Sequence, residues 1–222
     1  MQQPVPQFAY NADGSPANLP QRATVLHTAI WEVGGVEPQP DGIARRLIKA
    51  LEEQGEVAEA FLNLTGKNGK GKTLDDLQEE VVDVFLVMAD ALFEYIRHLP
   101  AVRSEEGMHM RASADAILWT VGEPAAFDDF SARLWVFSRR LLTAQDALVE
   151  ATNAPEDLDR SDWLGTTLLE AYKMAVRMMH TRIAGGAEQS AGALEHRLLL
   201  LLEKKIAKWH RVRNAGPGVP AL

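Results

Sequence analysis

Residues 47–61, LIKALEEQGEVAEAF, and residues 77–96, LQEEVVDVFLVMADALFEYI, are the stretches around which the chain is organised. Both place apolar residues at the three- and four-residue spacing of a helix, and neither shows the alternation of a strand. In the second stretch, apolar residues cover most of the helix circumference, which is typical of a helix buried on nearly all sides. We therefore predict two neighbouring helices, the first amphipathic and the second buried.

Carboxylates are concentrated on these two helices: Glu52, Glu53 and Glu56 on the first, and Glu80 and Asp83 on the second. Residues three and four apart are neighbours on a helix surface, so the acids on each helix should repel one another. Buried carboxylates without a counter-charge are costly or take up protons, and no basic residue occurs between Lys49 and Lys67. The pattern predicts a divalent cation between the helices, and oxygen ligands suit Mg²⁺ or Mn²⁺. A solvated acidic rim is the alternative.

The segment between the two helices, residues 63–72, is rich in glycine and lysine. Its three ammonium groups, on Lys67, Lys70 and Lys72, are candidates for binding a polyphosphate. The segment only partly meets the P-loop spacing, and it joins two helices rather than a strand and a helix. Alone it would be a flexible turn, whereas beside a metal site it favours phosphate binding.

Start and stop signals predict helices along the rest of the chain as well. Thr73 and Asp76 have the spacing of a capping box, Asp41 is a candidate N-cap, and Pro124 suits a first helical position. The predicted helices cover residues 21–33, 41–62, 73–98, part of 104–121, 124–151, 158–184 and 193–213. We divide the chain into a flexible lead-in (1–20), a catalytic helical region (21–100), a C-terminal helical region packed on it (101–213) and a tail (214–222). The expected fold is an all-α helical bundle.

The composition of the chain limits the binding partners and the cellular location that we expect. The chain has 222 residues, and its formal net charge of −8 argues against nucleic acid or an anionic membrane as a partner. It has no cysteine, which excludes disulfides, thiolate zinc sites and thiol nucleophiles. The first residues lack the features of a signal peptide, and no apolar run approaches the ~18 residues of a membrane span. We expect a cytoplasmic protein.

The acidic motif resembles that of a known family. E-E-x-x-E at residues 52–56 and E-x-x-D at residues 80–83, framed by Gly-Glu-Val-Ala-Glu-Ala and Glu-Val-Val-Asp-Val, are similar to the MazG-like nucleotide pyrophosphohydrolases over residues 25–98. The resemblance implies a fold of the all-α NTP pyrophosphatase type. It also implies Mg²⁺-dependent cleavage of a nucleoside triphosphate between the α and β phosphorus atoms, which releases monophosphate and pyrophosphate and rids the cell of non-standard or surplus nucleotides.

Roles for individual residues follow from the resemblance. It implies that the metal ligands are Glu53, Glu56, Glu80 and Asp83. Glu52 would be a further ligand or the base that activates water, so that Glu52 and Glu53 are the candidate catalytic residues. Two alternatives stay open. The bundle could be catalytically silent and act as an interaction or regulatory module, or it could be a related enzyme for dUTP or phosphoribosyl-ATP.

The second half of the chain contains a weak internal similarity. Residues 139–150 can be laid over 45–56, and residues 162–170 over 75–83, with Ala147 in place of Glu53 and Thr167 in place of Glu80. We interpret this as a degenerate repeat that supplies the packing surface a subunit partner gives in this superfamily. Chance alignment of similar helices is the alternative. The chain is then expected to form a homodimer or to be an internal pseudo-dimer.

The last predicted helix is basic. It carries five cationic residues with an aromatic and a histidine beside them: Lys204, Lys205, Lys208, Arg211, Arg213, Trp209 and His210. Cations are routine near a helix C-terminus, where they interact favourably with the macrodipole. The functional alternative is that one or two of them reach a phosphate while Trp209 or another aromatic residue stacks on a base.

Overall fold

The computed structural model describes residues 19–35, 38–67, 69–120, 126, 129–181 and 191–214, and these residues form helices and no strand. The predicted all-α fold is confirmed for this part of the chain. Most of the expected flexible lead-in (1–18), Pro124, the end of the predicted sixth helix (182–184) and the tail from 215 onward lie outside the described residues.

The described residues contain seven α-helices and one short 3₁₀ helix, joined by loops. These are α1 (Leu19–Gly34), α2 (Gly42–Leu64), α3 (Leu74–His98), η1 (Ala101–Arg103), α4 (Ser104–Thr120), α5 (Phe130–Asn153), α6 (Leu158–Met179) and α7 (Ala191–Asn214). Most ends agree with the predicted ranges within a few residues. In the described part of the chain, none of these helices combines the length and hydropathy needed to cross a bilayer.

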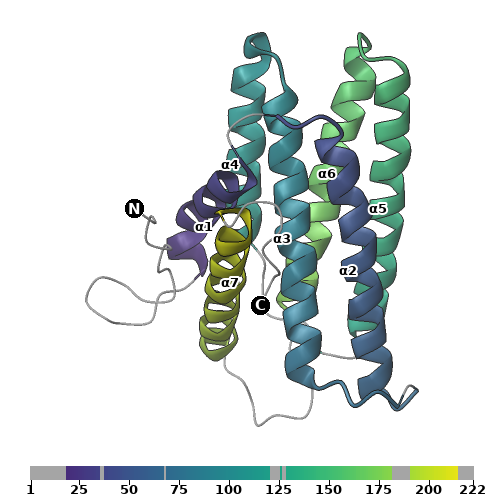
Figure 1. The fold of residues 1–222 in the computed structure, drawn as a ribbon, viewed down its shortest axis with the longest axis vertical. Helices are drawn as coiled ribbons and strands as arrows, with labels where there is room; N and C mark the ends of the chain where they lie inside the picture. The colour runs from purple at the N-terminus through teal and green to yellow at the C-terminus, as the bar shows by residue number, and fades with distance from the viewer. Residues whose placement is uncertain are drawn as a thin grey trace.

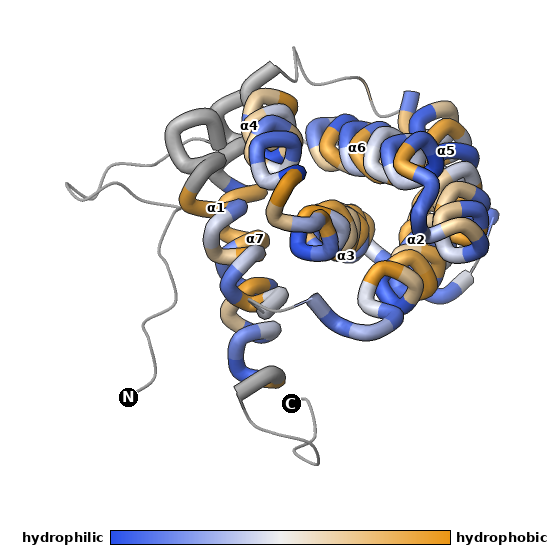
Figure 2. Tube along the Cα trace, turned by 90° about the horizontal axis from the view of Figure 1, so that it is seen from above, coloured by the Kyte–Doolittle hydropathy of each residue, from blue (hydrophilic) through white to orange (hydrophobic). Residues whose placement is uncertain are grey.

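Helix α3 lies at the centre of the bundle. Viewed along its axis in Figure 2, it is surrounded by α1, α2, α4, α6 and α7, and it contacts all five. Its apolar residues cover most of its circumference, and Val82, Phe85 and Phe93 are completely buried. The prediction of a helix buried on nearly all sides is therefore confirmed, because a helix with apolar side chains around its circumference needs neighbours on every face.

The two predicted N-terminal caps have different outcomes. Thr73 and Asp76 form the predicted capping box: the Thr73 hydroxyl accepts from the Asp76 amide at 3.2 Å, and the Asp76 carboxylate accepts from the Thr73 amide at 2.6 Å. Asp41 occupies the predicted N-cap position of α2, but its side chain makes no capping hydrogen bond. Asp41 has a left-handed backbone with φ of 55°, whereas a capping residue is normally extended so that its side chain can reach the first amides.

Two helical hairpins form the body of the bundle (Figure 1). Helix α2 packs antiparallel to α3, and α5 packs on α6, while contacts of α3 with α6 and of α2 with α5 join the hairpins. This is the pairing that the proposed repeat requires. Ala147 and Thr167, at the positions that correspond to Glu53 and Glu80, are both buried. The repeat itself and the oligomeric state stay predictions.

A buried ionic network joins α2 to α3. The Arg46 guanidinium donates to Asp90 and lies 3.3 Å from Glu94, whose carboxylate also accepts from Arg97 at 2.9 Å. These side chains are at most 9% exposed, so their charges are compensated by one another rather than by water. The network also explains Gly42: a Cβ at that position would collide with the Glu94 carboxylate.

His180, at the C-terminal end of α6, makes stability depend on pH. Burial, with a smaller effect of Arg133, lowers the pKa of His180 from 6.5 to about 4. Below pH 6.5 the unfolded chain binds a proton that the folded chain does not accept until near pH 4, so stability falls as pH falls through this window. The slope from one such group approaches about 1.4 kcal/mol per pH unit.

We expect a His180→Leu variant to lose this part of the pH dependence. Urea denaturation of both proteins between pH 4 and 6.5 measures it, and the difference between their slopes isolates His180 from other titrating groups. Parallel curves for the two proteins would show that His180 is protonated as easily in the folded state as in the unfolded state.

Candidate metal centre

Three carboxylates converge where α2 packs on α3. Glu53 of α2 and Glu80 and Asp83 of α3 each offer an oxygen, and these oxygens lie within 4.8 Å of one another. Their side chains are only 9%, 13% and 22% exposed, respectively. The i, i+3 spacing places Glu80 and Asp83 on one face of α3, and the antiparallel hairpin brings that face to Glu53. Within the described residues, this is the one group of acids and histidines with a geometry that could hold a metal ion.

The electrostatics of this group show that the carboxylates are crowded. Burial raises the pKa of Asp83 to about 6, although Lys205 acts against the shift. Burial, and then a hydrogen bond to Glu80, raise the pKa of Glu56 on the next turn of α2. Glu56, the fourth predicted ligand, thus lies near enough to Glu80 to affect its own ionisation, but it is not one of the three converging acids.

Lysines from three segments neutralise part of this charge. Lys49 lies 2.8 Å from Glu53 and 2.9 Å from Glu52, Lys72 lies 3.0 Å from Glu80, and Lys205 of α7 pairs with Asp83. The expectation that the first acidic stretch has no counter-charge is therefore wrong. The pairing of Lys49 with Glu53 could have been predicted from the sequence, because residues four apart are neighbours on a helix.

The remaining predicted site residues differ in whether they contact the three converging carboxylates. Glu52 is exposed, is paired with Lys49 and is not part of the carboxylate group. In the glycine and lysine loop, Lys72 reaches Glu80, but Lys70 forms an ion pair with Glu59 at 2.7 Å and Lys67 is exposed. Of the three lysines predicted to bind polyphosphate, the structure places one, Lys72, against the acidic centre.

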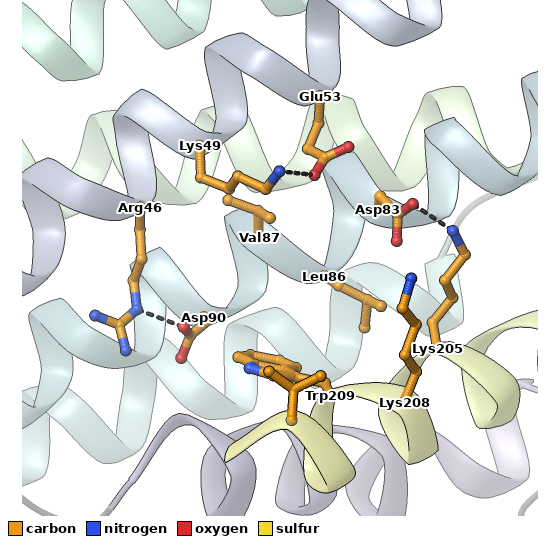
Figure 3. A pocket seen from close by; sticks show the side chains of 11 residues that line it. Arg46, Lys49, Glu53, Asp83, Leu86, Val87, Asp90, Lys205, Lys208 and Trp209 are labelled. Carbon is orange, nitrogen blue, oxygen red and sulfur yellow. Dashed lines mark hydrogen bonds and ion pairs between the residues drawn. The ribbon is translucent and has the colours of Figure 1, made fainter. Parts of the chain in front are cut away.

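A pocket of about 370 Å³ opens beside the carboxylates, between α2, α3 and α7 (Figure 3). It is lined by Arg46, Lys49, Glu53, Asp83, Leu86, Val87, Asp90, Lys205, Lys208, Trp209 and Val212. In Figure 3, Arg46 and Asp90 lie on one side of the pocket and Asp83, Lys205 and Lys208 on the other, with Trp209 between them beneath Leu86 and Val87. The volume is within the range of about 300–1,000 Å³ typical of small-molecule sites.

The lining contains residues that sequence reasoning did not assign to the site. Arg46 and Asp90 come together because α2 and α3 are antiparallel, and no local spacing relates them. Lys205, Lys208 and Trp209 belong to the basic last helix, where the sequence offered a phosphate-binding interpretation as the alternative to a helix-end effect. Only the packing of α7 beside α3 brings these side chains to the acids.

The donor set fits a hard divalent cation. It consists of carboxylate oxygens from two rigid helices, it lacks nitrogen and sulfur ligands, and it lies at the edge of a pocket that a ligand could enter. Comparison with known protein families, with curated proteins and with solved structures finds no match for this chain.

Proposed function

We propose that this protein is a metal-dependent nucleoside triphosphate pyrophosphohydrolase that cleaves its substrate to the monophosphate and pyrophosphate. The observation that carries the proposal is the convergence of Glu53, Glu80 and Asp83, with Glu56 against them, at the edge of a pocket large enough for a small molecule. The resemblance of the acidic motif to MazG-like enzymes agrees with this geometry, and it supplies the reaction and the choice of Mg²⁺.

The carboxylates have distinct positions in this proposal. Glu53, Glu80 and Asp83 would hold the metal, and Mg²⁺ at such a site lowers the pKa of water and stabilises charge on phosphate oxygens. Glu56 is better placed than the exposed Glu52 to accept a proton from the attacking water, because it touches Glu80.

The lysines have a second role when substrate is present. Lys72 and Lys205 hold Glu80 and Asp83 in the free protein, and their ammonium groups lie at the place where a polyphosphate would approach the carboxylates. A cation bound by the acids would release part of each lysine's attraction to them, because its charge takes over their neutralisation. The same ammonium groups are then available for the phosphate oxygens.

The reaction is tested by product analysis. Purified protein is incubated with Mg²⁺ and a panel of canonical and modified nucleoside triphosphates, including dUTP, together with phosphoribosyl-ATP. We expect monophosphate and pyrophosphate in equal amounts, and no activity when EDTA removes the metal. Release of diphosphate and inorganic phosphate would instead show attack at the γ phosphorus and contradict the proposed reaction. The preferred member of the panel distinguishes a general enzyme from one for dUTP or phosphoribosyl-ATP.

A catalytically silent interaction module is the second candidate, and the ion pairs of the acids favour it. Lys49, Lys72 and Lys205 already balance much of the negative charge, as they would in a bundle that needs no cation. Calorimetry with Mg²⁺ and Mn²⁺ separates the two candidates. Saturable binding that is lost when Glu80 becomes glutamine supports the enzyme, and the absence of binding in the intact protein supports the silent bundle.

A further inference from the structure

We propose that α7 forms the substrate-binding wall of the site, with Lys205 and Lys208 binding the phosphate chain and Trp209 stacking on the nucleobase. This inference rests on the proposed function, because it takes a magnesium-nucleoside triphosphate as the ligand. It gives the helix that lies outside the acidic motif a direct role in binding. It also places the whole binding site within one chain.

The first argument is the position of α7. The helix packs beside α3 and α1, and three of its consecutive turns face the pocket through Lys205, Lys208, Trp209 and Val212. Figure 3 shows Lys205 and Lys208 extending from α7 toward Asp83, across the pocket from the α2 side chains. Two ammonium groups thus lie beside the acids, where the phosphates of a metal-bound nucleotide would be.

The second argument is that the helix macrodipole does not account for Lys205. Lys205 is more than two turns before Asn214, the last residue of α7, and the dipole effect is confined to the last turn. Its side chain is only 16% exposed and pairs with Asp83 and Glu79. Two acidic partners thus hold the Lys205 ammonium group at the edge of the pocket.

The third argument is the apolar surface further along the pocket. The Trp209 ring lies next to the pocket with Leu86 and Val87 of α3 above it, so a flat ring could enter between aromatic and aliphatic side chains (Figure 3). The ion pair of Arg46 and Asp90 lines the pocket beside this apolar surface. Ammonium groups beside the acids and an aromatic ring in the same pocket match the phosphates and the base of a nucleotide.

The experiment measures binding rather than turnover, so that it does not depend on catalysis. Isothermal titration calorimetry with Mg²⁺ compares the α,β-methylene analogues of ATP, GTP, CTP and UTP with inorganic tripolyphosphate, which has no base. We expect Trp209→Ala to weaken the best-bound analogue by about fivefold to a hundredfold, which corresponds to the roughly 1–3 kcal/mol of base stacking, and to leave tripolyphosphate affinity unchanged. Lys208→Gln should weaken both ligands.

Matched controls come from the same protein. Lys204 is on α7 but does not line the pocket, and Trp135 on α5 is 73% exposed, so Lys204→Gln and Trp135→Ala should bind both ligands as the unmodified protein does. Trp209→Phe keeps an aromatic ring and should retain most of the affinity. Trp209 packs against the core, so Trp209→Ala could disturb folding. Trp209→Phe tests the stacking role without removing the ring.

The outcomes separate this inference from the proposed function. Equal analogue affinity in Trp209→Phe, Trp209→Ala and the unmodified protein, or no binding of any analogue by the unmodified protein, overturns the role of α7. Analogue binding that depends on Trp209 and Lys208, in a protein that releases no pyrophosphate, upholds the role of α7 and overturns the hydrolase. Equal loss of analogue and tripolyphosphate in Trp209→Ala would also overturn the base-stacking role.

Discussion

Replacing Asp83 with asparagine is expected to reduce pyrophosphate release by at least about a hundredfold, because transition-state charge stabilisation by a metal or its equivalent is worth several kcal/mol. Asparagine keeps the size of the side chain and can offer a neutral oxygen, but it removes one of three converging negative charges. Mg²⁺ affinity measured by calorimetry should fall together with the activity.

This loss should occur without loss of the fold. Burial raises the pKa of Asp83 to about 6, which means that above this pH the ionised carboxylate destabilises the metal-free folded state relative to the unfolded one. Asparagine removes that penalty and still accepts a hydrogen bond from Lys205. We therefore expect the metal-free variant to unfold at a temperature no lower than that of the unmodified protein.

Asp75→Asn is the matched control. Asp75 is on the same helix, but its side chain is 71% exposed and pairs with Arg197 outside the pocket, so its activity should stay within about twofold of the unmodified protein. Full activity in Asp83→Asn, with normal Mg²⁺ affinity, would remove Asp83 from the metal site and leave the carboxylate group without its proposed function.

Replacing Arg97 with methionine is expected to cost about 3–5 kcal/mol of stability, the range observed when one partner of a buried ion pair is removed. The Arg97 side chain is 1% exposed and pairs with Glu94, which is completely buried. It also donates to the Trp31 carbonyl at 2.8 Å and lies over the Trp31 ring at 4.4 Å. Methionine fills similar space but leaves Glu94 with less compensation.

Urea denaturation of this variant measures the loss, and two further variants interpret it. Arg160→Met removes an arginine that is 41% exposed and pairs with Glu150, so it should cost less than about 1 kcal/mol. The double variant Glu94→Gln and Arg97→Met should recover part of the stability, because the uncompensated charge is gone. A loss below about 1 kcal/mol in Arg97→Met would show that Glu94 is stabilised without Arg97.

Local sequence patterns predicted most of the helices and the three carboxylates of the site. Apolar spacing predicted α2 and α3, and the Thr73 capping box fixed the start of α3 at the residue observed. The i, i+3 pairs identified Glu53, Glu80 and Asp83, because spacing along a helix determines which side chains share a face. Asp41 is at the predicted N-cap position of α2, but its left-handed backbone is not the extended conformation from which a side chain caps the first amides.

Partners from distant parts of the chain could not be predicted in this way. Lys205 meets Asp83 although the two are far apart in sequence, and Arg46 meets Asp90 only because the hairpin is antiparallel. Lys49 shows the opposite case, since its pairing with Glu53 follows from helix geometry and was overlooked. Lys67 and Lys70 were assigned to phosphate by their nearness in sequence, but the loop does not bring them to the carboxylates.

The sequence by itself determined that this protein is helical and which carboxylates lie side by side on each helix, because both properties follow from residues within one or two turns of each other. Only the tertiary structure decided that α7 lies against the acids, that Lys72 and Lys205 pair with Glu80 and Asp83, and that Trp209 shares their pocket. These contacts arise from burying the apolar faces of α3 and α7 together, and no spacing along the chain encodes which faces will meet.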